Sequence, residues 1–188
     1  MAIKIYIDQG HNPMSPNTGA EGNGLREQDI TYTVGKELAA LLRANGNFEV
    51  RLSRPTPETQ LGNSNASSLV QRVTDANSWG ANYFISIHTN ASELIGASGS
   101  EQLVYRTEGV AYRLAQAIGE QLALTTGLRN RGVVARPGLY VLRRTAMPAV
   151  LSEIGFITNP GDAALMENRP DLFALGIYRG ILQYLDLL

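Results

Sequence analysis

Polar and apolar residues alternate at the start of the chain, and this period of two then gives way to helical spacing. Ile3, Ile5 and Ile7 lie two residues apart, which is the period of a β-strand. Along residues 26–46, apolar side chains recur every three or four positions before Gly46, a pattern typical of an amphipathic helix with a glycine C-cap. The chain is therefore predicted to begin with a strand followed by a helix.

Segments with the two-residue period of strands and segments with helical spacing continue to alternate up to the end of the chain. The stretch at 83–88 is apolar on both faces, which favours a central strand covered on both sides. Residues 129–138 have the composition of a loop. The other predicted strands are residues 48–54, 99–106, 139–142 and 149–154, and the other predicted helices are residues 69–80, 109–127, a helix opened by Asn159-Pro160, and 171–188.

Strands that alternate with helices predict an α/β fold. We expect a single domain over residues 1–188, with a twisted, mostly parallel (mixed) sheet of about six strands and helices on both faces. The sequence shows no internal repeat, no low-complexity run and no linker between domains. One domain is therefore the simplest interpretation of the chain.

Composition narrows the possible partners. Sixteen basic and 17 acidic residues give a net charge of −1, which does not favour nucleic acid as a partner. No stretch approaches the roughly 20 apolar residues of a membrane span. The start of the chain does not resemble a signal peptide. Export is then expected to depend on a lysis hole, a trimmed precursor, or a longer exported protein from which this domain is excised.

Four polar residues are expected to meet at one edge of the sheet. His11 follows the first strand, His88 ends the strand at 83–88, and Glu153 ends the strand that contains AVLSE. Ligands bind outside the carboxyl ends of parallel strands. Glu27 lies in the first turn of the first helix, three residues before Ile30, and a right-handed crossover brings that turn to the same edge.

These four residues together suggest metal chemistry. Each histidine alone is typical of a structural residue, and a glutamate at a helix start commonly interacts with the helix dipole. Glu153 is less ordinary, because a carboxylate flanked by core residues is costly to bury. The chain has no cysteine, so any metal site must use His, Asp and Glu. Two His and one carboxylate form a zinc set with a free position for water, and a second carboxylate can transfer protons.

The stretches around these residues resemble a known family. IDQGHN, GLREQDI, SIHTN and MPAVLSEIGFITN occur in the order found in the zinc-dependent N-acetylmuramoyl-L-alanine amidases, whose catalytic domains cut peptidoglycan. The resemblance covers nearly all of the chain. Gln9 replaces the usual proline, and Asn12-Pro13 replaces the usual Gly-Gly. We therefore expect the first loop to follow a different path beside the metal, with consequences for substrate preference.

The resemblance implies an activity and a role for each residue. Zn²⁺ is expected to be held by His11, Glu27 and His88, with Glu153 as the catalytic general base. The reaction is hydrolysis of the amide between the lactyl group of N-acetylmuramic acid and L-alanine of the stem peptide. Asn90 and Arg144 are candidate contacts to that peptide. The alternative for Asn90, which is slightly favoured, is to cap the turn, and a charged loop such as that of Arg144 is more commonly just solvated.

Two other functions compete with this reading. A zinc peptidase would cut within the stem peptide, and a non-catalytic module would bind the wall without cutting it. Both have the same partner, peptidoglycan, and the same place of action, the bacterial cell wall. The physiological setting stays open between a phage endolysin, a sporulation or germination lysin, and an autolysin.

Overall fold

A six-stranded mixed sheet forms the centre of the molecule in the computed structural model, which describes residues 2–94 and 96–188. The strand order is β4-β1-β5-β8-β6-β7. The first four of these strands are parallel, β6 is antiparallel to β8, and β7 is parallel to β6. The strands are β1 (Ile3–Gln9), β4 (Phe48–Leu52), β5 (Tyr83–Asn90), β6 (Ser100–Val104), β7 (Asn130–Ala135) and β8 (Ala149–Phe156). The predicted mostly parallel sheet is confirmed.

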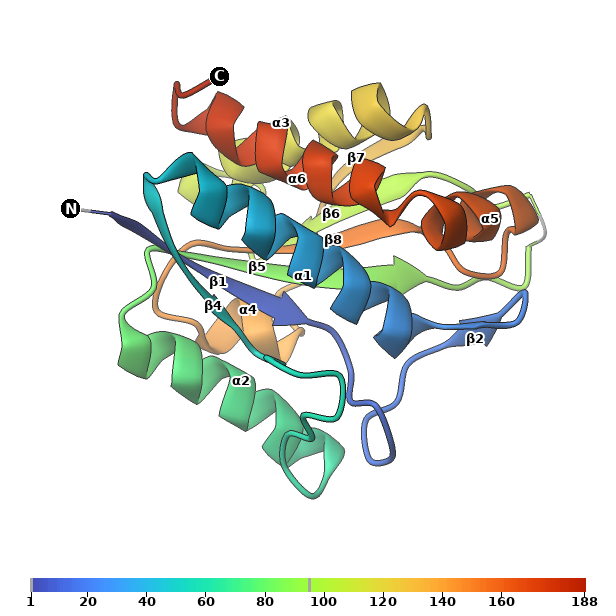
Figure 1. Cartoon of the computed structure of the whole chain (residues 1–188), viewed down its shortest axis with the longest axis horizontal. Coiled ribbons are helices and arrows are strands. Elements are labelled where there is room, and N and C mark those ends of the chain that lie inside the picture. The colour runs from blue at the N-terminus through green and yellow to red at the C-terminus, as the bar shows by residue number, and fades with distance from the viewer. Residues whose placement is uncertain (1, 95) are drawn as a thin grey trace.

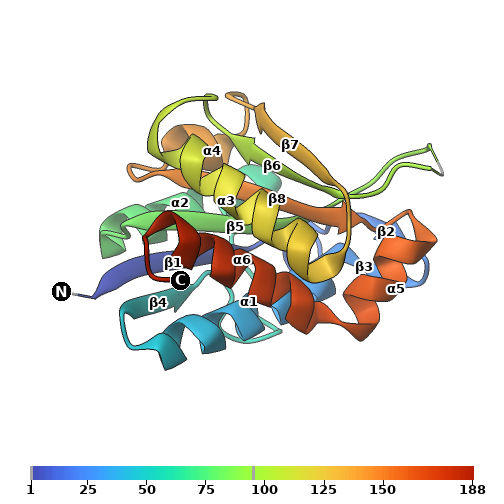
Figure 2. The same ribbon diagram turned by 90° about the horizontal axis from the view of Figure 1, so that it is seen from above.

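Helices cover both faces of this sheet, as predicted (Figures 1 and 2). One face carries α1 (Glu27–Asn45), α3 (Gly109–Thr126) and α6 (Pro170–Tyr184). The opposite face carries α2 (Asn65–Trp79) and the short α4 (Tyr140–Arg144). A two-stranded hairpin of β2 (Glu21–Gly22) and β3 (Leu25–Arg26) precedes α1, and α5 (Pro160–Asn168) follows β8. No helix in the described part of the chain is long and apolar enough to cross a membrane.

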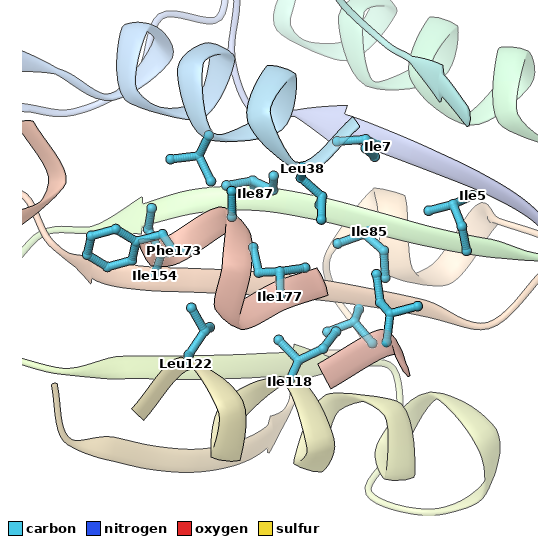
Figure 3. Close-up of a cluster of buried hydrophobic side chains, with 14 of the residues drawn as sticks. Ile5, Ile7, Leu38, Ile85, Ile87, Ile118, Leu122, Ile154, Phe173 and Ile177 are labelled. Carbon is cyan, nitrogen blue, oxygen red and sulfur yellow. The ribbon is translucent and has the colours of Figure 1, made fainter. Parts of the chain in front are cut away.

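The alternation of side chains along the central strands creates two separate cores. Ile85 and Ile87 of β5 point toward α1, α3 and α6, where they join the larger cluster drawn in Figure 3. Phe84 points to the other face and stacks on Tyr6 at a ring-centroid distance of 5.5 Å. Both faces are therefore dry along the first part of β5, which explains why its sequence is apolar at nearly every position.

Two predictions for the segment between α3 and β8 were wrong. Residues 129–138 are not all loop, because they contain β7, which pairs with β6 at the edge of the sheet. Residues 139–142 are not a strand, because residues 140–144 form α4. Both places beside β8 are taken, by β5 and β6, so residues 139–142 cannot pair with it. Val141 and Leu142 are instead buried in the α2-side core.

Two strands extend beyond the polar residues that were expected to end them. β5 continues past His88 to Asn90, and β8 continues past Glu153 to Phe156. The backbone N–H of Ile157 then donates to the carbonyl of Asn90 at 2.8 Å, so the two strand ends stay joined. His88 and Glu153 therefore lie on hydrogen-bonded strands and not on loops, which holds their positions more rigidly.

Candidate metal centre

The carboxylate of Glu27 lies between two imidazoles. Glu27 is the first residue of α1, which begins at the end of the sheet where β1 and β5 finish (Figure 1). Its Oε2 is 3.2 Å from Nε2 of His11, and its Oε1 is 3.0 Å from Nδ1 of His88. The same oxygens accept hydrogen bonds from the backbone N–H groups of Ala20 and Thr89, both at 2.9 Å. Glu27 is 3 % exposed, and its orientation is determined by these four contacts.

His11, Glu27 and His88 together fit a divalent cation. One potential ligand atom from each lies within 4.8 Å of the other two. The imidazole rings of the two histidines meet edge to face, with centroids 4.8 Å apart. Nδ1 of His11 is buried and has no hydrogen-bond partner among the described residues. Two imidazoles and one carboxylate are a donor set typical of zinc, with a fourth position left for water or substrate.

The charges of this cluster stabilise one another. Burial by itself would raise the pKa of Glu27, but the hydrogen bonds and charges of His11 and His88 outweigh burial and lower that pKa well below its usual range. Burial would likewise lower the pKa of His88, but the hydrogen bond and charge of Glu27 raise it. A buried negative charge is thus maintained beside two imidazoles, which is the electrostatic environment that a cation requires.

Glu153 lies one strand away from this cluster. In the register of the sheet it pairs with His88 on β5 and with Glu101 on β6, so the three side chains point to the same face. Burial raises the pKa of Glu153 to about 7, and the charges of Glu27 and Glu101 add to this rise while His88 opposes it. Its Oε2 is buried and makes no hydrogen bond within residues 2–94 and 96–188. Such a carboxyl group can both accept and donate a proton near neutral pH.

The loop after β1 is packed through the residues that differ from the family pattern. The side chain of Gln9 donates to the carbonyl of Tyr32 at 3.2 Å and accepts from the N–H of Arg54 at 2.9 Å. Asn12 donates to the carbonyl of Leu61 at 2.9 Å and accepts from its N–H at 3.2 Å. Both side chains are fully buried. The expectation of an altered loop path stays a prediction, but the side chains of Gln9 and Asn12 are both buried and hydrogen-bonded to neighbouring segments.

A glycine beside the histidines leaves no room for a larger residue. A Cβ atom on Gly10 would lie 2.5 Å from Cε1 of His88 and 2.6 Å from the carbonyl oxygen of Ile87. We expect Gly10→Ala to destabilise the protein by about 1–3 kcal/mol, as overpacking does, and to weaken metal binding by displacing His88. Urea denaturation and zinc titration would measure the two effects.

Gly138→Ala is the matched control, because a Cβ there meets no atom within 4 Å. Its free energy of unfolding should stay within about 0.5 kcal/mol of the wild-type value. A Gly10→Ala protein with unchanged stability and unchanged zinc affinity would show that β5 can shift freely at this point.

The two candidate substrate contacts lie in different places. Asn90 ends β5 two residues after His88, and its side chain accepts from the N–H of Ala91 at 2.9 Å, which is a local turn contact. Arg144 is exposed at the end of α4, and its carbonyl accepts from the side chain of Asn77 near the end of α2. Since β5 starts just after α2, Arg144 lies near the amino end of the sheet and apart from the histidines. A substrate contact for either residue stays a prediction.

A buried arginine beside the site was not singled out from the sequence. Arg72 lies on the inward face of α2, one residue before Val73, and is 1 % exposed. It donates to Asp8 of β1 at 2.5 Å and to the carbonyl of His11 at 2.6 Å. A charged residue at an apolar position of an amphipathic helix was the available signal.

A small cavity opens beside the two histidines, between α2 and α4. Its volume is about 120 Å³, and apolar side chains form much of its wall. The residues that line it are Asp8, Gly10, His11, Asn17, Leu69, Arg72, His88, Leu139, Tyr140, Val141 and Leu151. A group attached to a bound substrate could therefore be enclosed next to the candidate metal position.

The fold and the site together define an α/β domain with a candidate His–Glu–His metal centre at the carboxyl edge of its parallel strands. Comparison with known proteins identifies the family. Residues 5–183 match the family described as N-acetylmuramoyl-L-alanine amidase, and the chain belongs to it. The resemblance inferred from the motifs is confirmed.

Individual relatives agree with this assignment. The chain is 38 % identical over 182 residues to the N-acetylmuramoyl-L-alanine amidase CwlM of Bacillus licheniformis, and 37 % identical over 184 residues to LytC of Bacillus subtilis. These matches cover 95 % and 96 % of the chain but only 65 % and 35 % of the two relatives. The catalytic domain of CwlV from Bacillus (Paenibacillus) polymyxa superimposes with a TM-score of 0.86, 32 % identity and 99 % coverage of both chains.

Proposed function

We propose that this chain hydrolyses the amide bond between the N-acetylmuramoyl group and L-alanine of peptidoglycan, at the bacterial cell wall, with Zn²⁺ as cofactor. The observation that carries the proposal is the cluster of His11, Glu27 and His88 with the buried Glu153 on the neighbouring strand. Membership of the amidase family supports the same reaction. The ligands, the metal and the role of Glu153 are parts of the proposal.

Each residue has a defined part in the proposed reaction. His11, Glu27 and His88 would hold the zinc ion, which supplies a Lewis acid for the scissile carbonyl and lowers the pKa of water. Glu153 accepts a proton from the attacking water and returns it to the nitrogen of the leaving amine. The carbon–nitrogen bond breaks, so the lactyl group ends as a carboxylic acid and L-alanine gains a free amino group.

Removal of the metal should abolish this activity. Treatment with a chelator is expected to stop the clearing of a turbid suspension of cell walls, and addition of about one equivalent of Zn²⁺ should restore it, because three protein ligands leave one position open for catalysis. Elemental analysis of the purified protein would identify the metal. The proposal would be contradicted if the protein kept full activity after chelation while elemental analysis found no divalent metal in it.

The products formed from purified muropeptides distinguish the competing functions. An amidase releases a peptide with N-terminal L-alanine and leaves the sugar intact, and mass spectrometry would detect both products. A peptidase would instead cut within the stem peptide. A non-catalytic module would bind cell-wall sacculi with or without metal and would release nothing. Only the first result agrees with the proposed function.

A further inference from the structure

Arg72 makes contacts that a purely structural ion pair would not need. Its Nη1 donates to Oδ1 of Asp8 at 2.5 Å and to the carbonyl of Gln9 at 2.6 Å. Its Nη2 donates to the carbonyl of His11 at 2.6 Å and lies 3.3 Å from Oδ1 of Asn12. One guanidinium group therefore binds four of the five residues from 8 to 12, which carry the chain from β1 into the candidate site.

His11 needs such support because its backbone conformation is unfavourable. Its φ of 66° lies in the left-handed region, which residues with a side chain adopt at an energetic cost. In this conformation the His11 carbonyl meets Arg72, while Nε2 of the same residue lies 3.2 Å from Glu27. The backbone contact and the position of the imidazole ring are thus two consequences of one local conformation.

The same group of contacts reaches the second histidine. Oδ2 of Asp8 accepts from the hydroxyl of Ser86 at 2.7 Å, and Ser86 precedes His88 by two residues on the same face of β5. Burial would raise the pKa of Asp8, but the charge and hydrogen bond of Arg72 lower it, which favours the carboxylate form of Asp8. Asp8 and Arg72 are each 1 % exposed. The ion pair therefore lies in the dry layer directly behind the candidate ligands.

We propose that Arg72 is a positioning residue for the metal centre, which holds the backbone carbonyls of Gln9 and His11 so that the imidazole of His11 faces Glu27 and His88. This inference rests on the proposed metal site. It assigns two separable tasks to one side chain: neutralisation of Asp8, which a lysine can also perform, and simultaneous binding of two carbonyls, which requires the forked geometry of a guanidinium.

Zinc affinity of the Arg72→Lys protein tests the proposal. Lysine keeps the positive charge beside Asp8, but its donors all lie on one nitrogen, whereas two separate nitrogens of Arg72 meet the carbonyls of Gln9 and His11. We expect the dissociation constant for Zn²⁺ to rise about 10–100-fold, which is the loss typical of residues that orient metal ligands. The visible absorption spectrum of the Co²⁺-loaded protein should change as well, because it reports the geometry of the ligands.

A control variant separates positioning from general stability. Leu38→Ala opens a cavity in the core on the other face of the sheet, far from α2. It should unfold at lower denaturant concentration than the wild-type protein, and it should bind Zn²⁺ within about threefold of it, since it alters none of the contacts to His11.

A double variant covers the case in which Arg72→Lys does not fold. Asp8→Asn combined with Arg72→Met removes both buried charges, and replacement of a buried ion pair by uncharged residues is often tolerated. It also removes the donors to the Gln9 and His11 carbonyls. Its zinc affinity should therefore fall by at least the factor expected for Arg72→Lys, while Leu38→Ala keeps its affinity.

The outcomes decide the proposal in every case. Wild-type zinc affinity with an unchanged Co²⁺ spectrum in Arg72→Lys would overturn it, as would an equal loss of affinity in Leu38→Ala. If the wild-type protein bound no metal, the proposed function would fail separately. The three-bond HN–Hα coupling of His11 in the metal-free protein would then decide, because it depends on φ. A changed coupling in Arg72→Lys supports positioning, and an unchanged coupling contradicts it.

Discussion

Replacement of Glu153 by glutamine is expected to lower the turnover of cell-wall fragments about 10²–10⁴-fold, which is the usual contribution of a positioned general base. Glutamine has nearly the same shape, so the packing of β8 should not change. It cannot accept a proton, however, and the buried Oε2 of Glu153 is the unpaired acceptor beside the ligand cluster. Zinc content should be unaffected, because Glu153 is not among the three clustered candidate ligands.

The measurement is a turnover assay on muropeptides combined with elemental analysis of the same Glu153→Gln sample. Glu101→Gln is the matched control, since Glu101 is the neighbouring carboxylate in the same row of the sheet and has Arg131 4.0 Å away. We expect at most a few-fold change there, because Glu101 lies one strand farther from His88. Retention of wild-type turnover by Glu153→Gln would remove Glu153 from the proposed mechanism.

Replacement of Glu27 by glutamine is expected to have the second large effect, which is loss of the metal itself. Glu27 contacts both imidazoles, and both of its oxygens also accept backbone hydrogen bonds. Glutamine removes the negative charge and turns an N–H₂ donor toward one of those backbone N–H groups. Substitution of residues that only orient metal ligands lowers affinity by up to about 100-fold. We expect a larger loss of zinc affinity for Glu27→Gln, and turnover should fall with it.

Calorimetric titration with Zn²⁺ would measure this loss directly. Asp29→Asn is the matched control: Asp29 lies in the same first turn of α1, but its side chain is 59 % exposed and interacts with Arg26 at the surface. Its removal should leave zinc affinity and turnover unchanged. The prediction would be wrong if Glu27→Gln bound zinc as tightly as the Asp29→Asn protein does.

Most of the fold was predictable, because its periodic segments depend on local spacing. The strand at Ile3–Gln9 and the helix at Glu27–Asn45 each present one continuous apolar face, and such faces determine which element can be buried. The segment from 129 to 144 was not predictable in the same way. It contains a short strand with two valines, which pairs with β6 at the edge of the sheet, followed by a short helix that buries Val141 and Leu142 in the α2-side core. Both elements depend on contacts with segments that are distant in the sequence.

In the candidate site, too, some features were predictable from local sequence and others depended on tertiary contacts. Histidine and glutamate at predicted strand and helix ends suggested His11, Glu27, His88 and Glu153 without coordinates, because parallel strands bring their carboxyl ends to one edge. The role of Arg72 depended on a contact across 61 residues of sequence, from its side chain to the His11 carbonyl. No local pattern encodes which backbone carbonyl a buried guanidinium will meet.

The sequence by itself thus determined the order of most of the elements, the family, and the residue types available to bind a cation and move a proton. These properties follow from periodicity and from side-chain chemistry, which are local. Only the tertiary structure decided that one carboxylate lies between two imidazoles, that His88 and Glu153 share a register, and that Arg72 holds the loop of His11. Those arrangements depend on how separate elements pack, and packing is a property of the whole chain.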